Sequence, residues 1–173
     1  MAGPLNVPYF RQLDNEGGQG WRECASSTAA MLAAFMGKVT TDDEYNRTRR
    51  RFGDSTDVSA HTRALAALGL EPLFRTDGDW GTVEHWISKG RPLILPYLHQ
   101  GPVTKPSGGG HWTLCTGIGP DTLTVHDPML EPDMVHGGHI PGRTGRSVLL
   151  TRRNFGRRWM VEGPGSGWYL TVL

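Results

Sequence analysis

The sequence lacks the features that mark membrane, disulfide-rich or nucleic-acid-binding proteins. No apolar run approaches the roughly 18 residues of a transmembrane helix, so we expect no integral membrane segment. Only two of the 173 residues are cysteine, which excludes a disulfide scaffold. Eighteen basic residues balance seventeen acidic ones, and a net charge of +1 gives no overall attraction to nucleic acid.

The start of the chain also lacks the pattern of a secretory signal. No basic segment followed by an apolar one occurs in the first ten residues, MAGPLNVPYF. We therefore expect synthesis in the cytoplasm, where cysteines stay reduced. A reduced cysteine is either an inert residue of the hydrophobic core or a reactive nucleophile, and Cys24 and Cys115 could each be either.

The chain does contain helical patterns early and strand patterns late. An Ala-rich apolar run predicts a buried helix over 24–36, and Thr41 with Glu44 forms a capping box. Further helices are predicted over 42–51, 57–68 and 80–88, and strands over 70–75, 93–98, 112–118, 122–126, 158–161 and 168–172, with 5–10 a strand or extended segment. This order predicts an α+β fold in one domain, residues 1–173.

Cys24 stands at the predicted start of the first helix. The dipole at a helix N-terminus favours a thiolate, and the small neighbours Ala25, Ser26 and Ser27 leave room for a substrate backbone. The alternative is an inert cysteine that begins an apolar helix, since free cysteine is among the most buried residue types. Cys115 alternates with apolar residues in a predicted strand, so we interpret it as core.

A histidine and an aspartate can complete a nucleophilic site. His111 opens a predicted hairpin after a run of glycines, and Asp127 follows the second strand. An antiparallel hairpin places these two residues side by side, where Asp127 would orient the His111 ring. Taken alone, each has a plainer interpretation: a histidine at a strand edge, and an aspartate that begins a turn before Pro128.

A cysteine nucleophile also needs donors for the oxyanion that forms on the substrate carbonyl. The backbone N–H of Cys24 is one candidate, and the side-chain amide of Gln12 or of Gln19 is another. The alternative for each glutamine is a solvated loop position. No single residue decides the matter, and the hypothesis depends on the ordered set of glutamine, cysteine, histidine and aspartate.

Two parts of the sequence resemble the thirty-nine-like cysteine peptidases of the papain clan. The first is Asn6–Asn15, with a Y-x-x-Q-x-D-N pattern, followed by CASSTAAML from Cys24. The second is Gly110-His111-Trp112, followed by Val125–Pro128. The similarity covers about three-quarters of the chain.

The resemblance implies a papain-like fold, with N-terminal helices packed on an antiparallel sheet. It implies Cys24, His111 and Asp127 as the catalytic residues and Gln12 as the oxyanion amide, although Gln19 has the spacing of the leader-processing branch. We expect substrate to contact Gly110, Trp112 and Trp21, and we expect no cofactor and no metal.

A free-standing chain with a Gly-Trp-Tyr C-terminus resembles the phage-encoded members regarded as cell-wall lytic endopeptidases. The expected activity is cleavage of peptide bonds in bacterial peptidoglycan by a monomer that reaches the wall after release from the cytoplasm. One alternative keeps the fold and cleaves leader peptides after Gly-Gly or transfers an acyl group to an amine. Another is a non-catalytic module that binds the cell wall.

Two further clusters invite functional interpretations. His136 and His139, with Asp133 nearby, have H-x-x-H spacing, but no helix holds them, so we interpret them as a solvated loop rather than a zinc site. The stretch Arg146–Arg158 contains five arginines and no acidic residue. It predicts a solvated basic face or a surface for anionic cell-wall polymers, and no nucleic-acid motif accompanies it.

Overall fold

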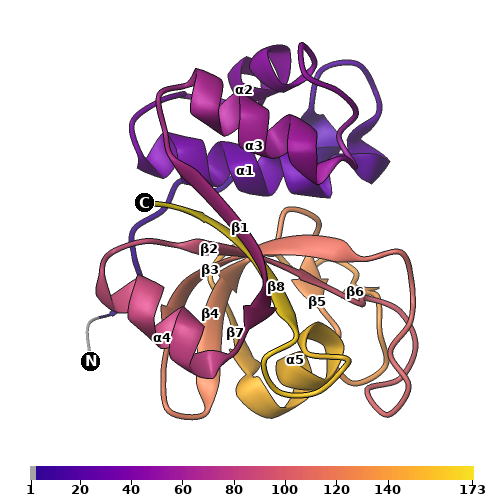
Figure 1. The fold of residues 1–173 in the computed structure, drawn as a ribbon. Helices are drawn as coiled ribbons and strands as arrows, with labels where there is room; N and C mark the ends of the chain where they lie inside the picture. Colours follow the sequence, from indigo (N-terminus) through magenta and orange to yellow (C-terminus); the bar gives the residue numbers. More distant parts are fainter. Residues whose placement is uncertain (1–2) are drawn as a thin grey trace.

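A six-stranded antiparallel sheet lies between two layers of helices in the computed structural model, which describes residues 3–173 (Figure 1). The helices are α1 (Cys24–Phe35), α2 (Asp42–Arg49), α3 (Val58–Ala67), α4 (Trp80–Ser88) and α5 (Arg152–Trp159). In spatial order the strands are β1 (Pro72–Gly78), β8 (Gly167–Val172), β2 (Leu93–Tyr97), β3 (His111–Ile118), β4 (Thr122–His126) and β7 (Val148–Thr151). Two short 3-10 turns, η1 (Gln12–Asp14) and η2 (Gly20–Arg22), precede α1, and β5 (Glu131–Pro132) and β6 (His139–Ile140) form a separate ribbon.

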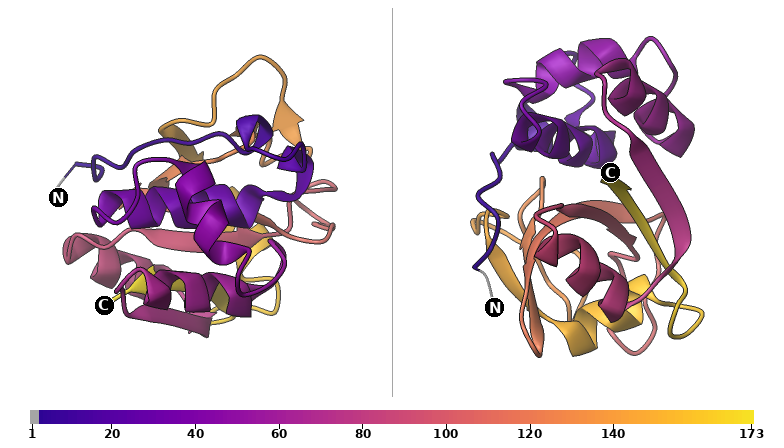
Figure 2. Two further views of the ribbon diagram at one scale, coloured as in Figure 1. Left: turned by 90° about the horizontal axis from the view of Figure 1, so that it is seen from above. Right: turned by 60° about the vertical axis from the view of Figure 1, so that its left-hand side comes forward.

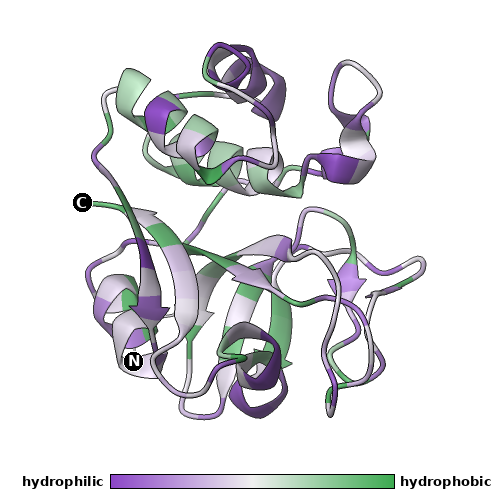
Figure 3. Cartoon of the chain, turned by 45° about the vertical axis from the view of Figure 1, so that its right-hand side comes forward, coloured by the Kyte–Doolittle hydropathy of each residue, from purple (hydrophilic) through white to green (hydrophobic). Residues whose placement is uncertain are grey.

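The side chains of the central strands point alternately to the two faces of the sheet, and this divides the hydrophobic core into two halves. Ile94 of β2 and Leu114 of β3 pack on the side of α1, whereas their neighbours Leu95 and Cys115 pack on the side of α4 and α5. Successive side chains of a strand point to opposite faces, so one strand supplies both halves. Hydrophobic residues accordingly gather on these strands and along α1, while α5 is largely hydrophilic (Figure 3).

Helix α1 is buried on all sides over most of its length. Every residue from Ala25 to Ala33 is buried, because α1 packs against β3 on one side and against α2 and α3 on the other (Figure 2). Small side chains permit this close packing between two layers. The first residue of α1, Cys24, is therefore held on the most enclosed helix of the fold.

Most of the predicted elements are present. The helices at 24–36, 42–51, 57–68 and 80–88 and the hairpin of 112–118 with 122–126 are confirmed to within about three residues at each end. The segment 5–10 is extended and lies outside the named strands, although Leu5 N–H donates to the carbonyl of Thr116. No helix in the described part of the chain is long and apolar enough to cross a membrane.

The prediction of a strand at 158–161 is wrong, and β7 was not foreseen. Residues 152–159 form α5, and the side chain of the N-cap residue Thr151 accepts from the Asn154 N–H. Phe155 and Trp159, four residues apart, are buried against the sheet. The helical spacing of these two aromatic residues outweighs the strand propensity of Trp159 and Val161.

Candidate active site

Cys24 is the first residue of α1 and is partly exposed. The preceding residue, Glu23, is buried and forms an ion pair with Arg49 of α2, with 3.4 Å between Oε2 and Nη2. This pair fixes the start of α1 against α2. Cys24 and Cys115 are both free thiols, and Cys115 is fully buried in the core, where burial raises the pKa of its thiol to about 12.

His111 and Asp127 lie side by side, as expected from the predicted hairpin of 112–118 with 122–126. His111 begins β3, and its Nε2 donates to both carboxylate oxygens of Asp127, over 2.9 and 3.0 Å. The Asp127 oxygens also accept from the hydroxyl of Tyr97, over 3.2 Å, and from the N–H of Met129, over 3.0 Å. Asp127 is thus completely buried but surrounded by donors, which fixes the plane of the His111 ring.

The charges of this pair support each other. Burial by itself lowers the pKa of His111, but the carboxylate of Asp127 and a hydrogen bond with Cys24 outweigh burial and raise that pKa to about 10. Burial likewise favours the neutral form of Asp127, but His111 and His139 hold its pKa well below the usual range. Because Nε2 of His111 faces Asp127, the other ring nitrogen, Nδ1, is the one available to Cys24.

The two candidate glutamines have different environments. Gln12 is buried in η1, which packs on η2 and on α1, and its Nε2 donates to the carbonyl of Gly20 over 2.9 Å. Gln19 is exposed beside Arg22 and Arg50 in a polar pocket. Gly20 leaves no space for a side chain, because a Cβ atom there would clash with the backbone of Gln12 and Leu13.

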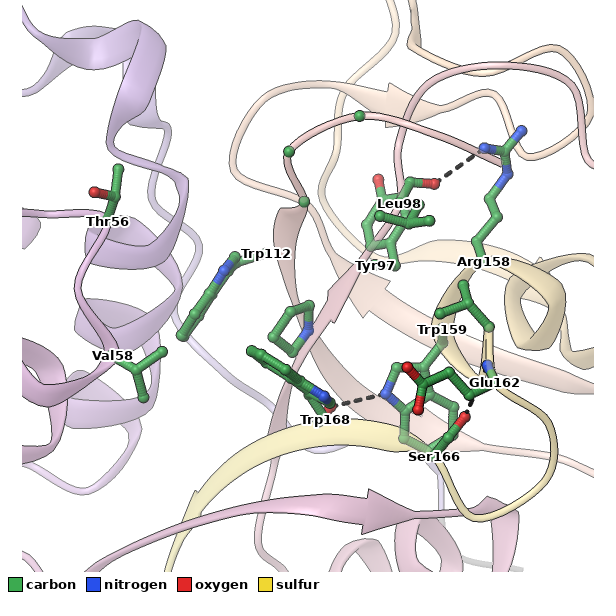
Figure 4. Close-up of a pocket in the computed structure, with 15 residues that line it drawn as sticks. Thr56, Val58, Tyr97, Leu98, Trp112, Arg158, Trp159, Glu162, Ser166 and Trp168 are labelled. Carbon is green, nitrogen blue, oxygen red and sulfur yellow. Dashed lines mark hydrogen bonds between the residues drawn. The ribbon is translucent and has the colours of Figure 1, made fainter. Parts of the chain in front are cut away.

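A pocket of about 420 Å³ is lined by residues on both sides of His111 in the sequence, but not by His111 itself. Gly110 and Trp112, the neighbours of His111, both line it, as do Val58 of α3 and Trp168 of β8 (Figure 4). The pocket therefore lies between the helical layer and the sheet. Trp21 does not line this pocket and is 70% exposed, with the guanidinium of Arg22 over its ring.

The interpretation of His136 and His139 as one solvated loop is wrong for His139. The His136 side chain is 82% exposed and pairs with Asp133. The His139 side chain is only 12% exposed, and its Nε2 lies 3.2 Å from Oδ1 of Asp127. The sequence carried no signal for this contact, because only the return of the loop places β6 beside β3.

The predicted basic face at 146–158 is only partly present. Arg158 is 1% exposed and donates to four main-chain carbonyls, those of Met134, Leu98, Gln100 and Gly101. Arg152 pairs with Glu84 of α4. Exposed arginines remain at 146, 153 and 157.

Known proteins resemble this chain in sequence and in fold. The chain matches the model of the Peptidase_C39 like family over residues 4–137. No curated protein matches the chain significantly. Among solved structures, it is similar to a protein described as a C39-like peptidase from Bacillus anthracis, with a TM-score of 0.66 and 14% identity over 98% of this chain and 95% of that one.

Two further structures show the same fold. One is the peptidase domain of Streptococcus ComA, a bi-functional ABC transporter, with a TM-score of 0.64 and 16% identity over 97% of each chain. The other is a double glycine motif protease from an AMS/PCAT transporter in complex with the leader peptide, with a TM-score of 0.59 and 16% identity over 99% of this chain and 95% of that one.

Proposed function

Because the chain belongs to the C39-like peptidase family and is a cysteine peptidase, we propose that Cys24 is its nucleophile, with His111 as the general base and acid. Asp127 orients His111 and stabilises its imidazolium form. Gln12 and the Cys24 N–H are the oxyanion donors. Membership in a peptidase family removes the reason to interpret the chain as a non-catalytic wall-binding module.

The reaction proceeds by acyl transfer. The thiolate of Cys24 attacks the carbonyl carbon of the peptide bond, and the oxyanion accepts from the Gln12 amide and from the Cys24 N–H, which has no acceptor within the helix. His111 protonates the leaving amine as the C–N bond breaks. His111 then takes a proton from water, which attacks the thioester and releases Cys24.

The observation that supports these roles is the position of His111 between Cys24 and Asp127. An imidazolium next to the sulfur stabilises the thiolate, and the raised pKa of His111 keeps the ring protonated near neutral pH. Gln12 is preferred to Gln19 because a buried amide is fixed before the oxyanion forms, whereas an exposed one has to be ordered.

We propose peptide bonds of bacterial peptidoglycan as the substrate. The exposed arginines at 146, 153 and 157 would attract an anionic cell-wall polymer, and the pocket lined by Trp112 and Trp168 has space for a peptide side chain. On this hypothesis the protein is made in the cytoplasm and acts on the wall after release, as a monomer.

Cell-wall clearing tests this substrate. The purified protein should reduce the turbidity of a cell-wall suspension, and the Cys24→Ala variant should not. Cys115→Ala is the matched control, because Cys115 lies in the core away from His111, and it should still clear the suspension. Equal clearing by wild type and Cys24→Ala would disprove the role of Cys24.

The second candidate is cleavage of leader peptides after Gly-Gly, or acyl transfer to an amine, by the same residues. It is favoured by the similarity in fold to a protease solved with its leader peptide. Mass spectrometry of products from defined muropeptides and from Gly-Gly leader peptides separates the possibilities. A product carrying an added amine would identify the transferase.

A further inference from the structure

A second histidine contacts the carboxylate that orients His111. His139 belongs to β6, in the ribbon that follows Asp127 in the sequence. Its Nε2 lies 3.2 Å from Oδ1 of Asp127, and its ring packs edge-on against the ring of His111, with 4.8 Å between centroids. Neither the acyl-transfer mechanism nor the family match, which covers residues 4–137, includes His139.

These three residues offer a set of ligand atoms typical of zinc sites. Two imidazole nitrogens and one carboxylate oxygen, from His111, His139 and Asp127, all lie within 4.8 Å of one another. Zinc binds histidine nitrogen at about 2.0–2.1 Å and carboxylate oxygen at about 2.0–2.2 Å, and three protein ligands leave a fourth position for water. In a tetrahedral site two such ligand atoms are about 3.3 Å apart, so the most distant pair has to approach by up to about 1.5 Å, through movement of the side chains.

The surroundings of the three ligands suit a small cation. Asp127 is fully buried, and the His111 and His139 side chains are 7% and 12% exposed, so packing holds all three ligands and His139 is the most accessible of them. A third ring, that of His99, lies 5.6 Å from His111 and 6.4 Å from His139, centroid to centroid. Its Nδ1 is buried and has no hydrogen-bond partner among residues 3–173.

We propose that His111, His139 and Asp127 bind a zinc ion, and that this ion inhibits the peptidase. A zinc ion on Nε2 of His111 displaces the proton there and takes the Asp127 carboxylate away from the ring. The ring of His111 is then held by the ion and drawn toward His139, without the carboxylate that orients it, so its Nδ1 is withdrawn from Cys24 and from the leaving amine. The inhibitory effect rests on the proposed catalytic roles, whereas zinc binding does not.

Zinc also binds thiolate–imidazole pairs, so binding has to be measured without the sulfur. Isothermal titration of Cys24→Ala protein with zinc chloride should show one ion per chain. The double variant Cys24→Ala/His139→Ala should bind zinc at least tenfold more weakly, and Cys24→Ala/His139→Asn should do the same if a folding defect in the alanine variant obscures the comparison. Cys24→Ala/His136→Ala is the matched control, because His136 is an exposed histidine of the same loop, and it should bind like Cys24→Ala.

Peptide hydrolysis in the presence of zinc tests the inhibitory role of the ion. Zinc should inhibit hydrolysis by wild type, a chelator should restore it, and His139→Ala should need at least tenfold more zinc for the same fractional inhibition. Absence of zinc binding by Cys24→Ala, or equal binding by the His139 variants, overturns the site. Binding to Cys24→Ala without inhibition of wild type overturns the inhibitory role alone. If wild type cleaves none of the peptides, the proposed function fails and the binding arm still decides the zinc site.

Discussion

At the scale of single residues, Asp127 determines the geometry and the charge of the site. Donors from His111, His139, Tyr97 and Met129 converge on its two oxygens. A fully buried carboxylate without them would be strongly destabilised in its charged form. Its negative charge in turn favours the imidazolium form of His111, on which the thiolate depends.

Replacing Asp127 by asparagine should therefore slow alkylation of Cys24 near neutral pH. The neutral amide no longer favours the imidazolium form of His111, so Cys24 loses the neighbouring positive charge that supports its reaction. We expect iodoacetamide to react with Cys24 about tenfold more slowly at about pH 6, with the rates of the two proteins converging in alkali, where His111 is neutral in both. Superimposable pH profiles for wild type and variant would refute this role.

Gln12→Ala should reduce peptide hydrolysis without changing the reactivity of Cys24. Loss of one oxyanion donor lowers kcat by about 100-fold to 1,000-fold, whereas alkylation forms no oxyanion. Gln19→Ala serves as the control and should hydrolyse peptide at the wild-type rate. The opposite pattern would assign the oxyanion amide to Gln19.

At the scale of elements, α5 connects the loops around the site to the sheet. Arg158, near its C-terminal end, donates to carbonyls in the chain after β2 and in the ribbon that carries His139. Burial lowers the pKa of Arg158, and the carbonyls compensate the buried charge. Within the basic stretch 146–158, Arg158 therefore stabilises the loops around the site instead of forming part of a charged surface.

Arg158→Met should destabilise the fold by about 3 kcal/mol or more, because the carbonyls of Met134, Leu98 and Gly101 lose their donor, and each unsatisfied buried group costs about 1–3 kcal/mol. The fourth carbonyl, that of Gln100, still accepts from the Ser107 N–H. Arg157→Met removes an exposed arginine next to it and should change the free energy of unfolding by less than about 0.5 kcal/mol. Urea unfolding of both variants measures the difference. Similar urea midpoints for the two variants would contradict this prediction and mean that water can replace Arg158 as the donor to these carbonyls.

At the scale of the whole molecule, stability should depend on the ionisation of one buried pair. The pKa of His111 is about 10 in the folded protein against 6.5 without the fold. The folded state therefore binds a proton more tightly, and its stabilisation is complete below about pH 6.5 and is lost as the pH rises through about 10. The depressed pKa of Asp127 acts in the opposite direction, so that stability also falls in acid.

Wild type should accordingly lose a few kcal/mol more stability than His111→Gln between about pH 8 and about pH 11. Both proteins are compared in a Cys24→Ala background, because His111 affects the ionisation of Cys24. The other groups that titrate in this range are then the same, and the difference isolates His111. Urea midpoints at several pH values measure it. Parallel pH dependences would show that His111 is not protonated in the folded protein.

The sequence by itself determined the elements whose signals are local. The Ala-rich run defined α1, the capping box defined the start of α2, and the hairpin placed His111 beside Asp127. In each case the interacting residues lie on one helix or on adjacent strands, so spacing alone predicts the contact.

Tertiary structure decided the contacts between distant segments. Arg158 is buried because loops far along the chain supply its acceptors, and His139 reaches Asp127 because β6 returns beside β3. The two cysteines also separate only in the fold: Cys24 opens a helix that faces His111, and Cys115 points to the other side of the sheet. The fold also shows that the charges behind a net charge of +1 include two buried arginines, Arg49 and Arg158, and one buried histidine–aspartate pair. Burial and partners, which composition does not record, decide what each charged group does.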